Sequence, residues 1–366
     1  MRFAEITGWG KCLPPAVLTN ADLSQLVDTS DDWITTRTGI KERRISHVPT
    51  SELAAVASWQ ALAAAGRSPA EVDFILLATC TPDTLLPSAA SNLQAQLGAS
   101  RAGVLDVNAA CSGFVYALVV GTQLVRAGAY SRVLVVGAER LTYWIDYTDR
   151  ATCVLFGDGA GAVLLEPSDQ PAGVIASELG SDGTAAGILE VPASGSNFSH
   201  LKSREDPAAF GIRMDGPEVF RRAVAAMADS AMRALAQAGL RLEDVDLLIP
   251  HQANARIMDA TARRLGLEPA KVMVNIESYG NTSAATVPIA LTEALENQRV
   301  TPGANLVMVA FGGGLSWAAA VVRWGQRTLP LQTSDATLPP FGGSALDLIQ
   351  PNLEFFSGAS SAPFRR

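Results

Sequence analysis

Long apolar runs, cysteine and histidine are scarce in this sequence of 366 residues. No apolar stretch reaches the roughly 18 residues that a membrane-spanning helix needs, and the first residues lack the apolar core of a secretory signal. The four cysteines, at positions 12, 80, 111 and 153, are spaced too widely for zinc-binding pairs or a disulfide framework. Unpaired thiols are typical of a reducing compartment, so we expect a cytoplasmic protein without a metal site or a membrane partner.

Basic residues are also fewer than acidic residues in this sequence. Lys and Arg number 28 against 36 Asp and Glu, which gives a formal net charge of −8. This balance argues against nucleic acid as a partner, although a local basic patch can still bind an acidic protein. Hydrophobic residues make up 48% of the chain, enough for a large buried core, and the length suggests two domains.

An internal repeat divides the sequence into two halves. Residues 61–66 (ALAAAG) recur as residues 234–239 (ALAQAG), and residues 72–75 recur as 245–248, both at an offset of 173 positions. Each half alternates helical and strand-like segments, which predicts an α/β fold with mostly parallel sheets covered by helices. We place the boundary near residue 170, with the halves at residues 1–170 and 171–325. An insertion at residues 180–215 is either a functional cover or a surface excursion.

Cys111 stands between a predicted buried strand at residues 102–107 and a predicted helix at residues 113–126. The free N–H groups and positive dipole end of such a helix favour a thiolate, and they can lower a thiol pKa from roughly 8.5 into the range 3.5–7.5. Small residues on both sides leave room for a substrate. The pattern therefore indicates a nucleophile, and a buried structural cysteine is the alternative.

Two further polar stretches follow predicted strands. His251 follows the strand at residues 245–249, and Asn281 follows the strand predicted at residues 272–276. Because ligands of α/β sheets bind beyond the carboxyl ends of the strands, we expect both side chains to converge on Cys111. We also expect Asn281 to take the place in the second half that Cys111 takes in the first. Without the repeat, His251 would be read as a structural group and Asn281 as a turn residue. The other two histidines, His47 and His200, lie in polar stretches typical of a surface.

Four motifs carry a resemblance to a known family: ACSGF at residues 110–114, PHQAN at 250–254, GNTS at 280–283 and FGGGLSW at 311–317. Together they resemble the β-ketoacyl-[acyl-carrier-protein] synthase III family of the thiolase superfamily, from residue 1 to about residue 324. The resemblance implies a thiolase-like, five-layered αβαβα fold with two pseudo-symmetric halves, usually a homodimer. It also implies acyl transfer from acyl-CoA to a cysteine, then decarboxylative condensation with malonyl-carrier protein, which initiates fatty acid biosynthesis without a metal or other cofactor.

The expected catalytic roles agree with that chemistry. Cys111 holds the acyl group and so splits the reaction into two steps. His251 and the Asn281 amide donate hydrogen bonds to the enolate that decarboxylation produces. The backbone N–H of Cys111, with one from Gly313 or Gly314, forms the oxyanion hole, because glycines let the main chain approach a ligand closely.

The resemblance also implies binding residues. The helix predicted after Ser30 resembles the coenzyme A entry, where Trp33 and Arg150 would sandwich adenine and Arg37 would meet phosphate. The expected coenzyme A contacts are Thr29, Trp33, Arg37, Arg150 and Asn254. Basic residues on the helix at 253–265 are expected to bind the acidic carrier protein, namely Arg256, Arg263 and Arg264. Leu86 is expected to reach across a dimer and close the partner's primer pocket.

The resemblance ends near residue 324. Residues 326–366 are rich in Pro, Ser and Gly around one apolar cluster, and they form either a docked or a disordered tail. Two other functions stay open at this point. A related condensing enzyme of secondary metabolism would use a different acceptor. A non-catalytic partner subunit would have lost the nucleophile, and the presence of Cys111, His251 and Asn281 argues against it.

Overall fold

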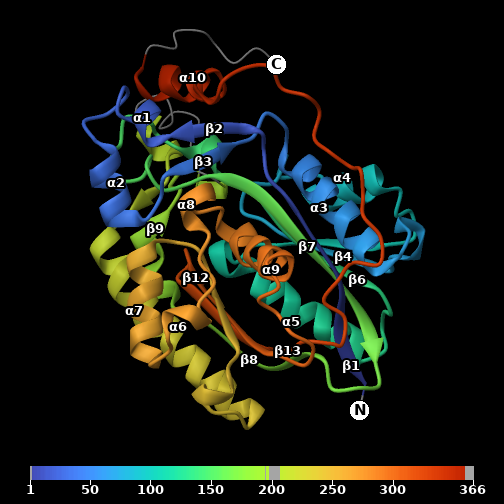
Figure 1. Cartoon of the computed structure of the whole chain (residues 1–366). Coiled ribbons are helices and arrows are strands. Elements are labelled where there is room, and N and C mark those ends of the chain that lie inside the picture. Colours follow the sequence, from blue (N-terminus) through green and yellow to red (C-terminus); the bar gives the residue numbers. More distant parts are fainter. Residues whose placement is uncertain (1, 194, 198–206, 359–366) are drawn as a thin grey trace.

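The computed structural model describes residues 2–193, 195–197 and 207–358 (Figure 1). His200, part of the insertion predicted at 180–215 and the last eight residues of the predicted tail lie outside the described residues. Within the described chain, no helix combines the length and the apolar character that crossing a membrane requires.

One mixed sheet of nine strands runs through both halves of the described chain, in the order β11-β12-β13-β8-β1-β7-β6-β4-β5. Its strands are β1 (Phe3–Cys12), β4 (Phe74–Ala78), β5 (Gly103–Val107), β6 (Val133–Arg140), β7 (Asp158–Ser168), β8 (Gly173–Ser181), β11 (Leu247–Pro250), β12 (Asn305–Gly312) and β13 (Ser316–Arg323). The two halves meet where Ala4 of β1 pairs with Gly173 of β8. Only glycine fits there, since a Cβ at Gly173 would lie 1.6 Å from the Ala4 carbonyl oxygen.

Helices form three layers around the two parts of this sheet (Figure 1). On one outer face lie α3 (Thr50–Ala65) and α4 (Ala89–Leu97), and on the other lie α6 (Gly216–Ala238) and α7 (Ala255–Leu265). Between them lie α5 (Gly113–Arg126) and α9 (Thr286–Glu296). This arrangement confirms the expected thiolase-like αβαβα fold.

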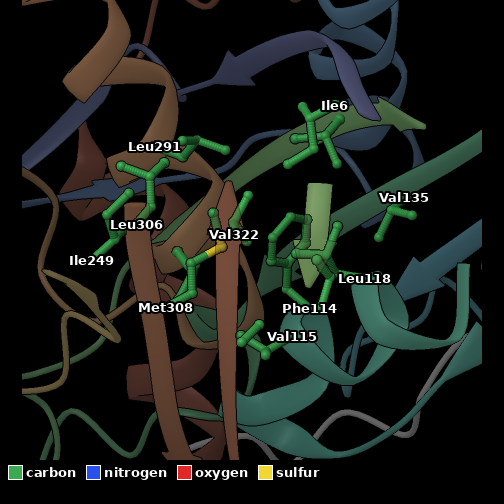
Figure 2. Packing of buried hydrophobic residues seen from close by; sticks show 14 of the residues in the cluster. Ile6, Phe114, Val115, Leu118, Val135, Ile249, Leu291, Leu306, Met308 and Val322 are labelled. Carbon is green, nitrogen blue, oxygen red and sulfur yellow. The ribbon is translucent and has the colours of Figure 1, made fainter. Parts of the chain in front are cut away.

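The central layer packs against both parts of the sheet. Phe114 and Leu118 of α5 and Leu291 of α9 lie among side chains from β1, β6 and β11 to β13 (Figure 2). Strand side chains alternate between the layers: Val135 of β6 faces the central helices, whereas Val136 packs with α3 and α4. Both faces of β6 are therefore apolar, because helices cover the sheet on each side of it.

Three expectations about strands are wrong. The halves are not mostly parallel, because β7 runs antiparallel to β6 and β1, and β13 runs antiparallel to β12 and β8. A short turn joins β12 to β13, and such a turn permits only antiparallel pairing. Residues 272–276 are not a strand, since the chain leaves the sheet after one bridge between Val272 and Leu248. The strand β5 is not buried but forms the edge of the sheet, where Leu105 is 49% exposed.

The offset of 173 residues relates several elements of the two halves. Strands β4 and β11 begin at residues 74 and 247, helices α3 and α6 end at 65 and 238, and helices α5 and α9 begin at 113 and 286. The division into residues 1–170 and 171–325 stays a prediction, because a single sheet passes through both parts.

The remaining elements lie around the ends of the strands. They are β2 (Ala16–Thr19), β3 (Glu42–Ile45), β9 (Leu189–Glu190), β10 (Arg213–Met214), α1 (Asn20–Leu23), α2 (Asp31–Thr38), α8 (Ile276–Tyr279) and α10 (Ala345–Phe356). Short 3-10 helices are η1 (Pro69–Glu71), η2 (Ala110–Ser112), η3 (Leu141–Trp144), η4 (Gly183–Ile188), η5 (Gly195–Asn197), η7 (Pro207–Phe210), η8 (Leu242–Asp244), η9 (Pro269–Lys271) and η10 (Ser283–Ala285). The tail is docked as far as it is described, because α10 packs beside β2 and β3 (Figure 1).

Candidate active site

Cys111 lies in η2, the single 3-10 turn between the end of β5 and the start of α5. This is the predicted strand-to-helix corner. The preceding residue, Ala110, has φ +47°, a left-handed conformation that is strained for any residue with a Cβ. The sharp turn sets the Cys111 side chain at the first turn of a 14-residue helix, with 8% of the residue exposed.

The glycine turn between β12 and β13 packs directly against Cys111. A Cβ on Gly312 would lie 2.5 Å from the Cys111 backbone nitrogen, so only glycine permits this approach. Ser316 ties the two segments together, because its hydroxyl donates to the Ala109 carbonyl at 2.9 Å and its own carbonyl accepts from Ser112 at 3.1 Å. The close approach of two main chains at the thiol is what an oxyanion hole requires.

The pKa of Cys111 is raised, not lowered as predicted. Burial raises it to about 12, and a hydrogen bond with the Ser283 side chain opposes this shift without cancelling it. The cause is desolvation: the thiolate loses more hydration in the closed site than the helix end restores. Cys111 is therefore a thiol at neutral pH in the free protein.

A buried carboxyl group that the sequence did not reveal, that of Glu139, lies on the far side of Ser283 from the Cys111 thiol. Glu139, near the end of β6, accepts hydrogen bonds from the Ser283 hydroxyl at 3.0 Å and the Thr81 hydroxyl at 2.5 Å. The backbone N–H of Cys80 also donates to it, at 3.2 Å, and burial raises the pKa of Glu139. Ser283 thus connects Cys111 to Glu139. A charged residue at the end of the apolar run VLVVGAE was the available signal.

His251 follows β11 and is held by its backbone and its ring. Its N–H donates to the Val309 carbonyl at 2.7 Å, and Nδ1 lies 2.6 Å from the Thr286 hydroxyl oxygen. Burial lowers the pKa of His251 to about 3, so the ring is neutral at physiological pH. The Thr286 hydroxyl also lies 3.0 Å from the Ser283 carbonyl oxygen. Its single proton can go to either acceptor, so Thr286 is able to hold either neutral tautomer of the ring.

Asn281 is oriented by its own turn. Its Oδ1 accepts the backbone N–H of Ser283 at 2.8 Å, which leaves the amide NH₂ group available to a ligand. Asn108 makes the same contact with Ala110 at 3.3 Å, and Ser283 has φ +48°, close to the value at Ala110. The offset of 173 therefore pairs Asn281 with Asn108. The expected equivalence of Asn281 with Cys111 is wrong, because the counterpart of Cys111 is Ala284.

Two cavities meet at Cys111. The larger cavity, of about 740 Å³, is lined by Cys111, His251 and Asn281, so the structure brings the three predicted side chains to one space. The smaller cavity, of about 620 Å³, is lined by Cys111, Ser283, Gly313 and Gly314 at one end. Its lining also includes the polar residues Asn108, Ser181 and Glu190 and a set of apolar side chains, Leu141, Trp144, Phe156, Leu189, Val191 and Ile212. Part of the insertion predicted at residues 180–215 thus lines the site, which agrees with a functional cover and not with a surface excursion.

The predicted coenzyme A residues lie partly at the larger cavity. Trp33 and Arg37, from α2, line it, and Ser30 caps that helix as predicted. The guanidinium carbons of Arg37 and Arg150 lie 4.6 Å and 4.8 Å from the centre of the Trp33 ring. Arg150 therefore stacks on the ring itself, and a base can enter between them only when Arg150 moves. Thr29 does not line the cavity.

Asn254 and the three predicted arginines belong to α7. Asn254 lines the larger cavity and also caps the helix, because its Oδ1 accepts the Arg256 N–H at 2.9 Å. Arg256 lines the same cavity, Arg263 is exposed, and Arg264 forms an ion pair with Asp229 at 2.9 Å. The three arginines therefore differ in the charge that they offer a partner, since the charge of Arg264 is already paired with Asp229.

Leu86 lies away from both cavities. Its side chain is 89% exposed in this chain, and the neighbouring Leu85 is 87% exposed. Within one chain, Leu86 lines neither of these two cavities.

Comparisons with known proteins agree with these motifs. The family model described as 3-oxoacyl-[acyl-carrier-protein (ACP)] synthase III matches residues 105–183, and the model of its C-terminal part matches residues 235–324. A β-ketoacyl-[acyl-carrier-protein] synthase III 2 of Vibrio vulnificus (strain YJ016) is 49% identical over 352 residues, 96% of this chain and 97% of the relative.

Two other matches cover a smaller share of this chain. A β-ketoacyl-[acyl-carrier-protein] synthase III of Roseiflexus castenholzii is 51% identical over 324 residues, 88% of this chain and 98% of its own length. The crystal structure of 3-oxoacyl-[acyl-carrier-protein] synthase III from Aquifex aeolicus VF5 has a TM-score of 0.82 and 45% identity. It covers 88% of this chain and 100% of that one.

Proposed function

This chain belongs to the β-ketoacyl-[acyl-carrier-protein] synthase III family, and on this premise we propose that Cys111, His251 and Asn281 carry out its reaction. The protein is an acyltransferase that condenses an acyl-CoA primer with malonyl-carrier protein, the step that starts fatty acid biosynthesis. The relatives do not favour the alternative of a secondary-metabolite enzyme with another acceptor.

The position of Cys111 where two cavities meet is the observation that carries the assignment of roles. The larger cavity, with Trp33 and Arg256 on its lining, takes the thioester arm of coenzyme A or of the carrier protein. The smaller and largely apolar cavity takes the acyl chain of the primer. A thioester carbonyl that spans the two lies beside the sulfur of Cys111.

In the first half-reaction, the sulfur of Cys111 attacks the thioester carbonyl and the carbon–sulfur bond to coenzyme A breaks. The proton of the Cys111 thiol passes to the departing sulfur, so the exchange needs no net base, and a raised pKa does not prevent it. The negative charge on the carbonyl oxygen is stabilised by the N–H groups of Cys111 and of Gly313 or Gly314 and by the N-terminus of α5.

In the second half-reaction, malonyl-carrier protein loses CO₂ and the electron pair forms an enolate. Nε2–H of neutral His251 and the NH₂ of Asn281 donate to the enolate oxygen. This requires the tautomer in which the Thr286 hydroxyl donates to Nδ1. The enolate carbon attacks the acyl group, Cys111 leaves as a thiolate, and it regains a proton from solvent. The scheme uses no metal or organic cofactor.

The exposed edge of the sheet supports a homodimer. Strand β5 is the last strand of the sheet and has unpaired backbone groups, with Leu105 half exposed. Leu85 and Leu86 are exposed apolar side chains of the same half. We place the enzyme in the cytoplasm, where acyl-CoA and the carrier protein are available and where its four cysteines stay free.

Intact-protein mass spectrometry tests this function. The protein is incubated with acetyl-, butyryl-, hexanoyl- and octanoyl-CoA and then with malonyl-carrier protein. We expect a mass increase of one acyl group, located on Cys111, and its loss as β-ketoacyl-carrier protein appears. Acylation that is discharged only onto water or a small-molecule acceptor would contradict the assigned acceptor.

The carrier-protein surface gives a first prediction. Reversing charge at Arg256, Arg263 and Arg264 should raise the KM for malonyl-carrier protein by about tenfold, because screened surface pairs each contribute up to about 1 kcal/mol. Acyl-CoA loading should stay within about twofold in the Arg263→Glu single variant, since Arg256 also lines the cavity that takes coenzyme A. Since Arg264 is paired with Asp229, Arg264→Glu alone should have the smallest effect. Arg101→Glu, an exposed charge that lines neither cavity, is the matched control. An unchanged KM in the triple variant would remove the patch.

The primer gate gives a second prediction. Leu86→Phe should shift kcat/KM toward acetyl-CoA, and Leu86→Ala should shift it toward longer primers. Each added methylene that is buried contributes roughly 0.8 kcal/mol, about fourfold, where it fits. Leu85→Ala, at a neighbouring and equally exposed leucine, is the control. A primer profile that neither substitution moves, in variants that are still dimeric by light scattering, would exclude Leu86 as the gate.

A further inference from the structure

Helix α10 packs against two segments that line the smaller cavity. One is η3, whose end residues Leu141 and Trp144 belong to the lining. The other is the segment that leads from η7 to Ile212, which also lines the cavity. Ile349 of α10 is fully buried in the same apolar cluster as Leu141 and Ile212. The helix therefore lies directly behind part of the cavity wall.

Asn352 fixes the first of these segments. Its Nδ2 lies 2.9 Å from the Thr142 carbonyl oxygen, 3.1 Å from that of Tyr143 and 2.9 Å from that of Ile145. The Thr142 carbonyl also accepts the Ile145 N–H at 3.4 Å, and Asn352 supplies a donor from another element to all three carbonyl groups. The start of η3 is anchored separately, because Asp158 accepts hydrogen bonds from the N–H and the hydroxyl of Thr142 at 3.0 Å and 2.6 Å.

Two aromatic side chains of α10 hold the second segment. The Phe355 ring packs edge-on against Phe210, with ring centres 5.6 Å apart. The Phe356 ring packs beside Gly211, because a Cβ added to Gly211 would lie 3.4 Å from a carbon of that ring. The segments are also joined to each other, because the N–H of Ile212 donates to the Trp144 carbonyl at 3.1 Å. The helix and both wall segments thus form one packed unit.

Helix α10 lies outside the residues that the two family models match, whereas η3 lies inside them. The family model of the C-terminal part ends at residue 324, and the Roseiflexus relative matches 88% of this chain. The Vibrio vulnificus relative matches 96% of this chain, so its match includes part of the tail. The catalytic motifs lie in the residues that the family models match, and α10 is an addition to that part.

We propose that α10 is a specificity element that sets the length of primer the enzyme accepts, by holding the wall of the smaller cavity in place through Asn352 and Phe355. The inference rests on the proposed use of that cavity as the primer pocket. The wall residues Leu141, Trp144 and Ile212 are anchored to the core on one side and to α10 on the other. When the α10 contacts are removed, the wall is free to move outward, which makes room for longer acyl chains and removes contacts with short ones.

The test is Asn352→Asp, which keeps the shape of the side chain but replaces the NH₂ donor with an oxygen that faces three carbonyl groups. Acylation kcat/KM is measured with acetyl-, butyryl-, hexanoyl- and octanoyl-CoA. We expect the octanoyl-to-acetyl ratio to rise by about three- to tenfold, the range that one lost hydrogen bond gives, with the KM for malonyl-carrier protein unchanged. Gln350→Ala, on the exposed face of the same helix, should leave the ratio as it is.

Phe355→Leu tests the same wall through its second contact and should shift the ratio in the same direction. A helix that only stabilised the protein would lower kcat/KM for all primers by one common factor, so an unchanged ratio in both variants would overturn the proposal. A wild-type protein that no acyl-CoA acylates would instead overturn the proposed function, and the inference with it. The two failures are thus distinguishable.

Discussion

Cys111→Ala is expected to abolish both acylation and condensation, with a loss on the order of 10⁴ or more in each, because the covalent intermediate needs the sulfur. The side chain lies where the two cavities meet, so alanine also leaves the oxyanion donors and the cavity walls in place. Mass spectrometry after incubation with acyl-CoA measures the first step, and formation of β-ketoacyl-carrier protein measures the second.

The control is Cys12→Ala. Burial raises the pKa of Cys12 to about 12, as it does for Cys111, but Cys12 lies within β1 and lines neither cavity. The two thiols therefore match in burial and in the direction of their pKa, and they differ in access to substrate. Acyl label on Cys111→Ala at the wild-type level, or its loss from Cys12→Ala, would show that the nucleophile is assigned to the wrong cysteine.

His251→Ala is expected to separate the two half-reactions. Acylation of Cys111 should stay within about tenfold of wild type, whereas condensation should fall by a hundredfold or more, because a donor to the enolate oxygen is lost. The proton of the Cys111 thiol leaves with coenzyme A in the first step, so this step has no requirement for the imidazole. Single-turnover measurements of each half-reaction give the comparison, and equal losses in both would contradict the division of roles.

The pH dependence adds a second check on His251. Because burial lowers its pKa to about 3, the ring stays neutral and keeps its donor throughout the range from pH 5 to 8. Condensation by the acylated enzyme should therefore show no acid limb near pH 6.5, the value of an ordinary histidine. A limb at that pH which disappears in His251→Ala would mean that the ring titrates in the working enzyme.

Local sequence signals predicted some parts of the site correctly. Helix α5 begins at Gly113 and ends at Arg126 as expected, and Ser30 caps α2, because helical spacing and cap residues act within a few positions along the chain. The position of His251 after a predicted strand likewise placed it correctly near Cys111, whereas Asn281 lies there although the strand predicted before it does not form. Each of these inferences needs only neighbours in sequence or a repeat that the sequence displays.

Features that depend on distant packing could not be predicted in this way. The sign of the pKa shift at Cys111 follows from burial by β12, β13 and the insertion, whose closure over the site is invisible in the sequence. Glu139 contacts Ser283 only because the end of β6 packs beside the start of η10, although 144 positions separate the two residues. The docking of α10 depends on three carbonyl groups that converge on Asn352, and no sequence pattern announces that contact.

Because the site is built from both halves of the chain, it can form only late in protein synthesis. Cys111 leaves the ribosome well before its partners, since at roughly 5–20 residues per second His251 follows about 7–28 s later. Gly312, which packs against the Cys111 main chain, follows later again. A nascent first half therefore carries the thiol without the glycine turn or the imidazole. An incomplete chain cannot condense malonyl groups, and the enzyme becomes competent only when its second half is built.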